Sequence, residues 1–472
     1  MITNPFISDS LSKLITTQQA WHYRVIPKTK KDDTITFLSD SFSISGQEEL
    51  ALILNKNVEI EIIDSNMLLT LLEKHYTRNQ IDDRLQNSYY TGEADGFLNH
   101  VINEAKLLRS SDIHIEVYDL QCRVRIRIDG MLLQRYLLEK KQYPSLINKI
   151  KIISNLDIAE KRLPQDGRIL FESADGKIDI RVSVMPTLYG EKIVLRLLNH
   201  DATNIDIQNL GLKDLELYHY MEGIKKPNGI ILISGPTGSG KTTTLYATLK
   251  LLNKVTRNIL TIEDPIEYTL EGINQVQLKE SIGLTFAAAL RTFLRQDPDV
   301  IMLGEIRDPE TAAMAIRASL TGHLVLSTIH TNSAWGTISR LIDMGIAPFL
   351  LSNTLNTSVA QRLIRQLCPN CKKKIKFDCA LWPKGFKTEQ SVAHHYVANG
   401  CKHCYNTGYK GRIAIYEVIP ISTAFAEEIK NENHHVSGLM KEQGIHTLAD
   451  NALDIFLTGD TSLEEIYPLL MN

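Results

Sequence analysis

The feature that most constrains the fold is residues 229–246, where an apolar stretch runs through a glycine-rich turn into a threonine-rich segment. Residues 230–233 read Ile-Ile-Leu-Ile and predict a short buried strand. Residues 235–242 follow the spacing G-x-x-x-x-G-K-[ST] of a phosphate-binding loop, which lies between a strand and a helix. The flanking strand and helix disfavour the alternative of a chance glycine-rich turn. The sequence therefore predicts a nucleoside triphosphate as the ligand.

The residue types of this loop suit a bound phosphate. Glycines keep side chains away, so that main-chain N–H groups can surround the phosphate oxygens, and the following helix adds the positive end of its dipole. Lys241 would add a full charge at the β- and γ-phosphates, and Thr242 would place its hydroxyl on Mg²⁺. We expect the nucleotide to contact Gly235, Pro236, Thr237, Gly238, Ser239, Gly240, Lys241, Thr242 and Thr243.

Length and charge bound the rest of the chain. Its 472 residues suggest about three domains, on a prior of about 150 residues each. The net charge is −3, so no global field draws the chain to nucleic acid. No run of about 18 apolar residues occurs, and the N-terminus lacks a basic region followed by an apolar stretch. We therefore expect a cytoplasmic protein with no nucleic-acid partner.

Three domains are expected. Residues 1–90 predict a small α/β docking module, residues 95–205 an α+β domain, and residues 206–472 a nucleotide domain. In the last of these, strands and helices alternate, which predicts a parallel sheet covered on both faces. Ser65 is expected to cap a helix over 67–76, and Thr-Ser-Leu-Glu at 461–464 has the form of a capping box for the last helix. Other expected elements are helices at 96–108, 212–221, 286–294 and 309–320, strands at 34–38, 58–62, 178–185, 192–198, 258–262, 300–303 and 323–328, and a polar linker at 77–95.

Arginines recur in the second domain, upstream of the phosphate loop. Residues 162–168 read Arg-Leu-Pro-Gln-Asp-Gly-Arg and predict a turn flanked by basic residues. Arg181 and Arg196 lie on two predicted strands. For each arginine alone, a surface ion pair is the better interpretation. Arg168, Arg181 and Arg196 as a set favour neutralisation of a nucleotide's charge.

An acid ends a buried strand beyond the loop. Residues 299–305 are Asp-Val-Ile-Met-Leu-Gly-Glu, so a rigid element delivers Glu305 to the edge of the sheet. A nucleotide hydrolase needs a carboxylate in such a place, because its rate depends on positioning and charge stabilisation. We expect Glu305 to orient or deprotonate the attacking water. The alternative is an acid that caps the next helix together with Arg307 and Asp308.

Two further groups follow predicted strands. Glu263 and Asp264 end one strand and are expected to reach the water shell of the metal, although acidic loops are usually only solvated. His323 and His330 flank another strand, and their odd spacing places them on opposite faces, which argues against a shared metal. His330 is the better candidate for a γ-phosphate sensor, whereas His323 suits packing.

Two Cys-x-x-Cys pairs lie near the C-terminus. In a reducing compartment such pairs favour a metal over disulfides, and two pairs can present four thiolates to one ion. A closed Cys₄ zinc site has no open coordination position, so its role would be structural. The expected zinc finger spans residues 366–412, is rich in lysine, and is a hypothetical contact for lipid headgroups or a partner. Its ligands are Cys368, Cys371, Cys401 and Cys404, whereas Cys122 and Cys379 are taken as ordinary cysteines.

Over residues 95–472 the chain resembles the secretion and pilus ATPases, in particular the cytoplasmic assembly ATPases of type II secretion systems and type IV pili. Seven motifs carry the resemblance and occur in the family's order. They are Ser-Asp-Ile-His-Ile-Glu at 111–116, the 162–168 stretch, the phosphate loop, the acidic box at Glu263, Gly304-Glu305, the histidine box and the four cysteines.

The resemblance implies a RecA-like nucleotide domain with an inserted Cys₄ finger, preceded by a PAS-like α+β domain. It implies ATP, Mg²⁺ and Zn²⁺ as cofactors, and a homo-hexamer with nucleotide held between the two domains. Arg181 and Arg196 would contact the nucleotide, and Arg291 and Arg295 would be further essential basic residues. Arginines are worth about 10³ to 10⁵ in rate in related phosphoryl transfer.

The resemblance also implies work at the inner face of the cytoplasmic membrane, through platform and docking proteins of a pilus or secretion system. Rotation of one domain against the other would turn the platform. Three alternatives differ in output: a pilus retraction motor, a nucleotide-gated adaptor without turnover, and a DNA-translocating relative. Retraction motors are shorter and lack the finger, Lys241, Thr242 and Glu305 argue against the adaptor, and the net charge disfavours DNA.

Overall fold

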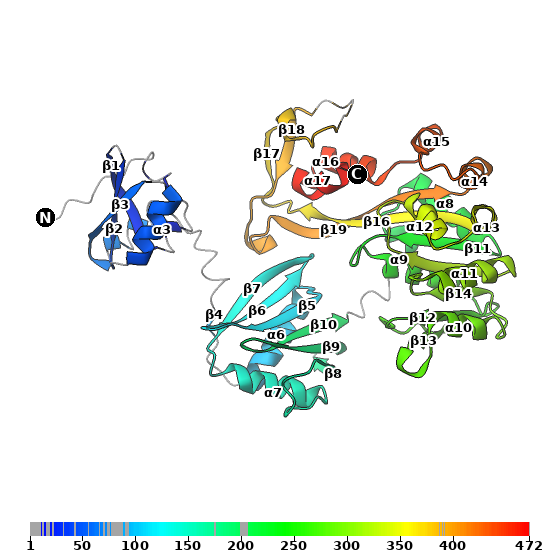
Figure 1. The fold of residues 1–472 in the computed structure, drawn as a ribbon, viewed down its shortest axis with the longest axis horizontal. Helices are drawn as coiled ribbons and strands as arrows, with labels where there is room; N and C mark the ends of the chain where they lie inside the picture. Colours follow the sequence, from blue (N-terminus) through cyan, green and yellow to red (C-terminus); the bar gives the residue numbers. More distant parts are fainter. Residues whose placement is uncertain are drawn as a thin grey trace. The chain divides into compact units, whose positions relative to one another are not determined.

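The computed structural model describes residues 11–471, with gaps at 12–13, 16–18, 21–22, 32, 42–43, 55, 66, 69–70, 73–75, 77–87, 90–93, 174–175, 199–205, 387, 389 and 391. The chain divides into two compact units, residues 1–91 with 134–138 and residues 92–133 with 139–472. In Figure 1 most of the first unit is blue, and the second runs from cyan to red. Most of the predicted linker at 77–95 lies outside the described residues, which include the short strand β4 (Ser88–Tyr89).

The first unit holds a three-stranded sheet in the order β1-β2-β3. Strands β1 (Val25–Lys31) and β2 (Thr34–Ser39) are antiparallel, whereas β2 and β3 (Asn57–Ile62) are parallel. A parallel pair needs a crossover, and helix α3 (Ile44–Leu54) lies within it. The α/β content and the strands predicted at 34–38 and 58–62 are confirmed.

The cap predicted at Ser65 is wrong. The Met67 N–H donates to Asp64 Oδ1 at 3.3 Å, and the Ser65 hydroxyl donates to Asp40 at 2.9 Å. Aspartate serves as a helix cap as well as serine does, so sequence alone did not choose between neighbours. The helix expected at 67–76 lies partly outside the described residues.

The second unit begins with helix α6 (Ala94–Leu107) and an antiparallel sheet that contains the order β6-β5-β10-β9-β8. Antiparallel strands with helices agree with the predicted α+β class. The stretch at 162–168 is only half a turn, because its last four residues begin β8 and pair with β9. This antiparallel ladder overrides the turn preference of Asp166-Gly167. The other elements are β5 (Asp112–Val117), β6 (Cys122–Ile128), β7 (Met131–Leu138), α7 (Tyr143–Ile153), β8 (Gln165–Ser173), β9 (Gly176–Thr187) and β10 (Gly190–Leu198).

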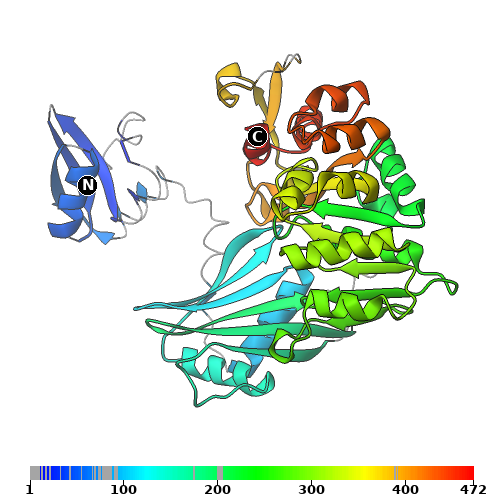
Figure 2. The same ribbon diagram turned by 45° about the vertical axis from the view of Figure 1, so that its right-hand side comes forward.

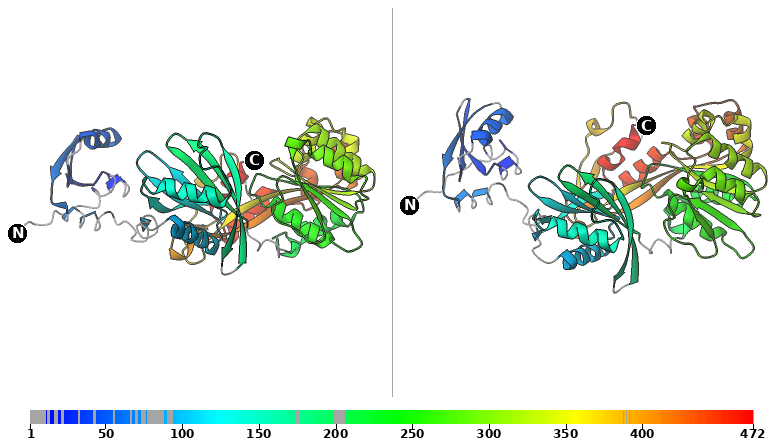
Figure 3. Two further views of the ribbon diagram at one scale, coloured as in Figure 1. Left: turned by 90° about the horizontal axis from the view of Figure 1, so that it is seen from below. Right: turned by 60° about the horizontal axis from the view of Figure 1, so that its bottom comes forward.

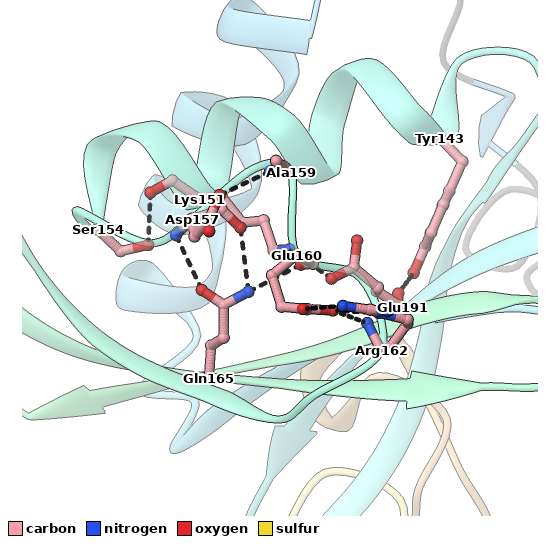
Figure 4. A network of polar contacts seen from close by, with 9 residues as sticks. All are labelled: Tyr143, Lys151, Ser154, Asp157, Ala159, Glu160, Arg162, Gln165 and Glu191. Carbon is pink, nitrogen blue, oxygen red and sulfur yellow. Dashed lines mark hydrogen bonds and ion pairs between the residues drawn. The ribbon is translucent and has the colours of Figure 1, made fainter.

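A polar network fixes the loop between α7 and β8 (Figure 4). Lys151 is fully buried, pairs with Glu191 at 2.5 Å and donates to the Glu160 carbonyl at 2.7 Å. Gln165 donates to the carbonyls of Asp157 and Glu160 at 3.0 and 2.9 Å. The Lys151 contacts satisfy a buried charge that would otherwise be costly, and the Gln165 bonds hold the loop from its more exposed side. The start of β8 therefore has a defined position.

The nucleotide domain is built on a second sheet, in the order β13-β12-β14-β15-β11-β16-β19. The strands from β13 to β16 are parallel, and β19 is antiparallel to β16. Two separate hydrophobic clusters pack on it, and helices flank it (Figures 2 and 3). The predicted parallel sheet covered on both faces is confirmed.

The elements predicted for this domain are present, with ends that differ by a few residues, whereas four elements in the following list, β13, α12, α13 and β16, were not predicted. They are α8 (Asp214–Lys225), β11 (Gly229–Ser234), α9 (Lys241–Leu252), β12 (Ile259–Glu263), β13 (Asn274–Gln277), α10 (Phe286–Phe293), β14 (Val300–Leu303), α11 (Pro309–Leu320), β15 (Leu324–Ile329), α12 (Gly336–Asp343), α13 (Pro348–Thr354), β16 (Leu355–Leu367) and β19 (Tyr409–Pro420).

The C-terminal part contains the cysteines and the last helices. Between β16 and β19 lies the two-stranded sheet of β17 (Lys373–Lys376) and β18 (His394–Val397). After β19 come α14 (Thr423–Lys430), α15 (Ser437–Glu442), α16 (Leu448–Thr458) and α17 (Leu463–Leu470).

The capping box predicted at 461–464 is wrong. Ser462 is the N-cap of α17, but it makes no side-chain cap bond. Its hydroxyl lies 2.7 Å from the Tyr409 hydroxyl, and the Thr461 hydroxyl donates to the Arg365 carbonyl at 2.8 Å. Contacts with β16 and β19 therefore take the groups that a local cap would have used.

Candidate nucleotide site

The phosphate loop has the backbone that its glycines permit. It joins β11 to α9, and Gly235, Gly238 and Gly240 all have positive φ, at 151°, 82° and 88°. A Cβ on Gly235 would lie 2.5 Å from the Gln361 carbonyl oxygen, so no larger residue fits there. The free N–H groups at the start of α9 thus form an anion-binding turn.

Lys241 lies in this loop at the first position of α9. Its ammonium donates to the carbonyls of Gly235 and Pro236, at 2.7 and 3.1 Å. Burial lowers the pKa of Lys241, and the charge of Glu305 partly opposes that shift. Thr242 is exposed next to it, where its hydroxyl can meet a ligand.

Three neighbouring strands bring the predicted hydrolysis groups to one edge. Strands β14, β15 and β11 lie side by side and parallel, so their carboxyl ends coincide. Glu305 follows β14, His330 follows β15, and the phosphate loop follows β11. These segments, which are distant in sequence, therefore end at one edge of the sheet.

Glu305 is held by two cationic or protonatable side chains. One carboxylate oxygen pairs with Arg307, and the other, Oε2, lies 3.3 Å from His330 Nε2. Within the described part of the chain, the buried Oε2 accepts no hydrogen bond, so it has capacity for a water molecule. The contact with Glu305 also raises the pKa of Arg307. Asp308, not Glu305, caps α11 by accepting from the Thr311 N–H at 2.8 Å.

Glu263 has a different environment. It is buried and accepts hydrogen bonds from Tyr246, from Thr261 at 2.6 Å and from Gln275 at 3.0 Å. Its oxygens are therefore engaged within the nucleotide domain, whereas Asp264 is exposed. His323 contacts the Ala318 carbonyl through Nδ1 at 2.9 Å, in agreement with a packing role.

The three arginines of the antiparallel sheet form a row. Arg168, Arg181 and Arg196 lie directly opposite one another on β8, β9 and β10. Like charges in such a row repel, and each has an acidic partner. Arg168 pairs with Asp179, Arg181 with Glu267 at 3.2 Å, and Arg196 with Asp112 at 2.9 Å. Arg181 also donates to the Ile266 carbonyl.

The two arginines of the α10 region are exposed or locally bonded. Arg291 pairs with Glu310 at 2.8 Å, and Arg295 donates to the Arg291 carbonyl at 3.0 Å. Neither makes a described contact with the phosphate loop. Their predicted part in nucleotide chemistry stays a prediction.

The four cysteines come together as predicted. The sulfur atoms of Cys368 and Cys401 are 3.8 Å apart, and those of Cys371 and Cys404 are 3.7 Å apart. All four sulfurs lie within 4.8 Å of one another. Zn–S bonds of about 2.3 Å in a tetrahedron require S–S separations of about 3.8 Å, so the cluster fits zinc. Cys122 is buried and Cys379 exposed, and neither joins the cluster.

Residues 91–468 match the family described as type II/IV secretion system proteins. The chain belongs to this family. It is 39% identical over 496 residues to the type IV pilus assembly ATPase PilB of Myxococcus xanthus (strain DK1622), covering 98% of this chain and 86% of that protein. It is 48% identical over 376 residues to the type II secretion system protein E of Pseudomonas aeruginosa, covering 78% and 74%.

Solved structures agree with this family membership. The ATPase DotB of Legionella pneumophila has a TM-score of 0.61 at 21% identity, covering 82% of this chain and 99% of that chain, and supports the fold alone. The pilus retraction motor PilT, solved with bound ADP, has a TM-score of 0.54 at 27% identity, covering 78% and 95%. No helix among the described residues of this secretion-family chain is long and apolar enough to span a membrane.

The secretion-family site contains two residues that sequence analysis missed. Gln361 accepts a hydrogen bond from the Thr244 hydroxyl at 2.9 Å, and Arg362 donates to the Asn332 carbonyl at 2.8 Å. Both lie on β16, more than 100 residues beyond the loop that they flank. Their stretch, residues 355–367, mixes polar and apolar residues and gives no distinct signal, so only the strand order places them at the site.

Proposed function

We propose that this chain is an Mg²⁺-dependent ATPase that hydrolyses ATP to ADP and phosphate and couples this to assembly of a type IV pilus or a type II secretion pseudopilus. One observation carries the proposal: Lys241, Glu305 and His330 meet at the carboxyl ends of three adjacent parallel strands. Ligands in open α/β sheets bind at this edge. The names of the 39% and 48% identical relatives support the output.

Each residue has a role in this reaction. The main-chain N–H groups of residues 235–243 bind the phosphates, and Lys241 exchanges its carbonyl partners for phosphate oxygens. Glu305 Oε2 accepts a proton from the attacking water, because it is buried and has no described donor. His330, beside that oxygen, senses the γ-phosphate. Glu263, from its buried position at the end of β12, contacts the water shell of the Mg²⁺.

The cofactors follow from the residues present. Thr242 would hold Mg²⁺ through its hydroxyl, and the ion would neutralise phosphate charge and orient the nucleotide. Zinc at the four cysteines would be structural, since four thiolates close its coordination shell. Arg181, Arg196, Arg291 and Arg295 would supply further charge once nucleotide binds.

The protein would work as a homo-hexamer at the inner face of the cytoplasmic membrane, held there by platform and docking proteins. Its three domains would be residues 1–90 for docking, 95–205 for the arginine row, and 206–472 for ATP hydrolysis. The PilT likeness keeps retraction as an alternative output. Assembly is favoured because the more similar relatives are named for pilus assembly and secretion.

Phosphate release by the purified full chain tests the proposal. With Mg²⁺ and ATP we expect steady turnover that EDTA stops. Lys241→Ala should abolish it, because the variant loses the charge at the phosphates, while circular dichroism stays unchanged. Lys254→Ala, a change beyond the end of α9, serves as the control and should turn over normally. Normal turnover by Lys241→Ala would reject this site.

A further inference from the structure

Strand β16 continues past the point where its neighbour ends. The β11–β16 pairing stops at Ser234 and Ala360, where β11 turns into the phosphate loop. Gln361 and Arg362 are the next two residues of β16, so they flank the loop itself. The Arg362 Nη1 atom lies only 3.0 Å from where a Cβ on Gly235 would stand.

The Arg362 guanidinium connects two loops of the site. Nη1 donates to the Gln361 carbonyl at 2.9 Å, and Nη2 donates to the Asn332 carbonyl at 2.8 Å. Asn332 comes two residues after His330, in the loop that follows β15. A guanidinium has five N–H donors, so these two bonds orient the group and leave donors for another acceptor.

Among the described residues, no carboxylate forms an ion pair with Arg362. Glu417 is the acid whose charge acts on it, but that carboxylate accepts from the N–H groups of Ala334 and Leu448, at 2.7 and 3.2 Å. Burial lowers the pKa of Arg362, and its charge in turn lowers the pKa of Lys241. Two cations thus lie close together at one loop with few anions to balance them.

Four other arginines of this part of the chain have acidic partners, and Arg295, which has none among the described residues, is exposed to solvent. Arg307 pairs with Glu305, Arg181 with Glu267, and Arg291 with Glu310. Arg365, on the same strand as Arg362, pairs with Glu465. A partly buried guanidinium without an acidic partner is costly unless an anion joins it.

We propose that Arg362 is a second phosphate-binding residue of the nucleotide site, beside Lys241, and that it contacts the γ-phosphate of ATP. The γ-phosphate is favoured over the others because the second anchor of Arg362 is the loop that follows the γ-phosphate sensor, His330. This inference rests on the proposed ATPase function and names a further residue for it. The arginine acts in the same chain as the phosphate loop and needs no neighbouring subunit.

Binding of ATP and of ADP to the purified full chain separates the possibilities. Arg362→Gln should weaken ATP binding about 10- to 100-fold, the effect of losing a hydrogen bond to a charged group, and ADP binding by less than about threefold. Arg362→Lys keeps the charge but not the fork of donors, so an intermediate loss is expected. Arg317→Gln, on the exposed face of α11, is the matched control and should bind both nucleotides normally.

Thermal unfolding without nucleotide distinguishes binding from support of the fold. A lower midpoint for Arg362→Gln with unchanged ATP affinity would mean that Arg362 only ties two loops together, which would overturn the inference. Equal loss of ATP and ADP affinity would overturn the assignment to the γ-phosphate. If Arg362→Gln does not fold, the ATP and ADP affinities of Arg362→Lys relative to wild type decide the question in the same way. Failure of the wild-type chain to bind ATP would instead reject the proposed function.

Discussion

Two acids at the ends of neighbouring strands show how the same sequence pattern leads to different sites. Glu263 ends β12 and Glu305 follows β14, its parallel neighbour. Glu263 accepts from three neutral donors, of which Tyr246 and Thr261 are buried, whereas Glu305 contacts Arg307 and His330, whose side chains are 60% and 51% exposed. Exposed partners can move without disturbing the core. Glu305 can therefore exchange partners during a reaction, and Glu263 cannot without rearranging its neighbours.

Replacing Glu305, the acid that can exchange its partners, should have the largest effect on the rate of ATP hydrolysis. We expect Glu305→Gln to lower kcat about 10²- to 10⁴-fold, because the amide cannot accept the proton of water. ATP affinity should stay near the wild-type value, since the phosphate loop is intact. Steady-state phosphate release and equilibrium nucleotide binding measure the two effects. Glu427→Gln, an exposed acid on α14, is the control, and a wild-type rate in Glu305→Gln would remove Glu305 from its role.

Replacing Glu263, whose partners are held in place, should lower the stability of the fold. Glu263→Ala would remove the acceptor of two buried hydroxyls, those of Tyr246 and Thr261, and one acceptor of the Gln275 amide, so we expect a loss of about 3 kcal/mol in the free energy of unfolding. Tyr246→Phe removes only one of the three bonds and should cost about 1 kcal/mol. Urea unfolding of both variants measures the steps. If Glu263→Ala unfolds like wild type yet does not hydrolyse ATP, Glu263 acts on the Mg²⁺ site. The contrast between Glu263 and Glu305 would then be wrong.

The cysteine cluster, like Glu263, is expected to contribute to stability more than to catalysis, so its replacement can be compared with that of Glu263. Cys368→Ser should release zinc and lower the thermal midpoint by several degrees, because metal binding there contributes to folding. Its effect on the KM for ATP should be small, because the cluster follows the C-terminal end of β16 and the phosphate loop lies beside the middle of that strand. Elemental analysis and thermal unfolding are the measurements. Cys379→Ser, outside the cluster, is the control, and zinc retained in Cys368→Ser would reject the site.

Local and periodic features were predictable from the sequence. The phosphate loop, the strand that delivers Glu305 and the four cysteines were all placed correctly. They depend on short spacings, and the strand order of a parallel α/β sheet then brings their ends together. The capping box at 461–464 failed because Ser462 and Thr461 bond to β19 and β16 instead. Local propensity gave way there to partners distant in sequence.

Environment was not predictable in the same way. Nothing near Glu263 in sequence reveals that Tyr246 and Gln275 enclose it, because those residues come from α9 and β13. Arg362 was not singled out from the sequence, because its place at the phosphate loop depends on β16 lying beside β11. The arginine row was suspected as a set, yet only the register of β8, β9 and β10 shows that its members are direct neighbours.

Strand β16 is also a mechanical connection. Cys368 lies six positions after Arg362, a distance of about 20 Å along an extended chain. Pairing with β19 continues to Leu367, with an irregularity between Arg365 and Leu367, so the segment stays in the sheet up to the cysteines. A change in the tilt of β16 at the phosphate loop would therefore displace the cysteine cluster at the other end of the strand. We expect the zinc finger to move together with the strand as one rigid element.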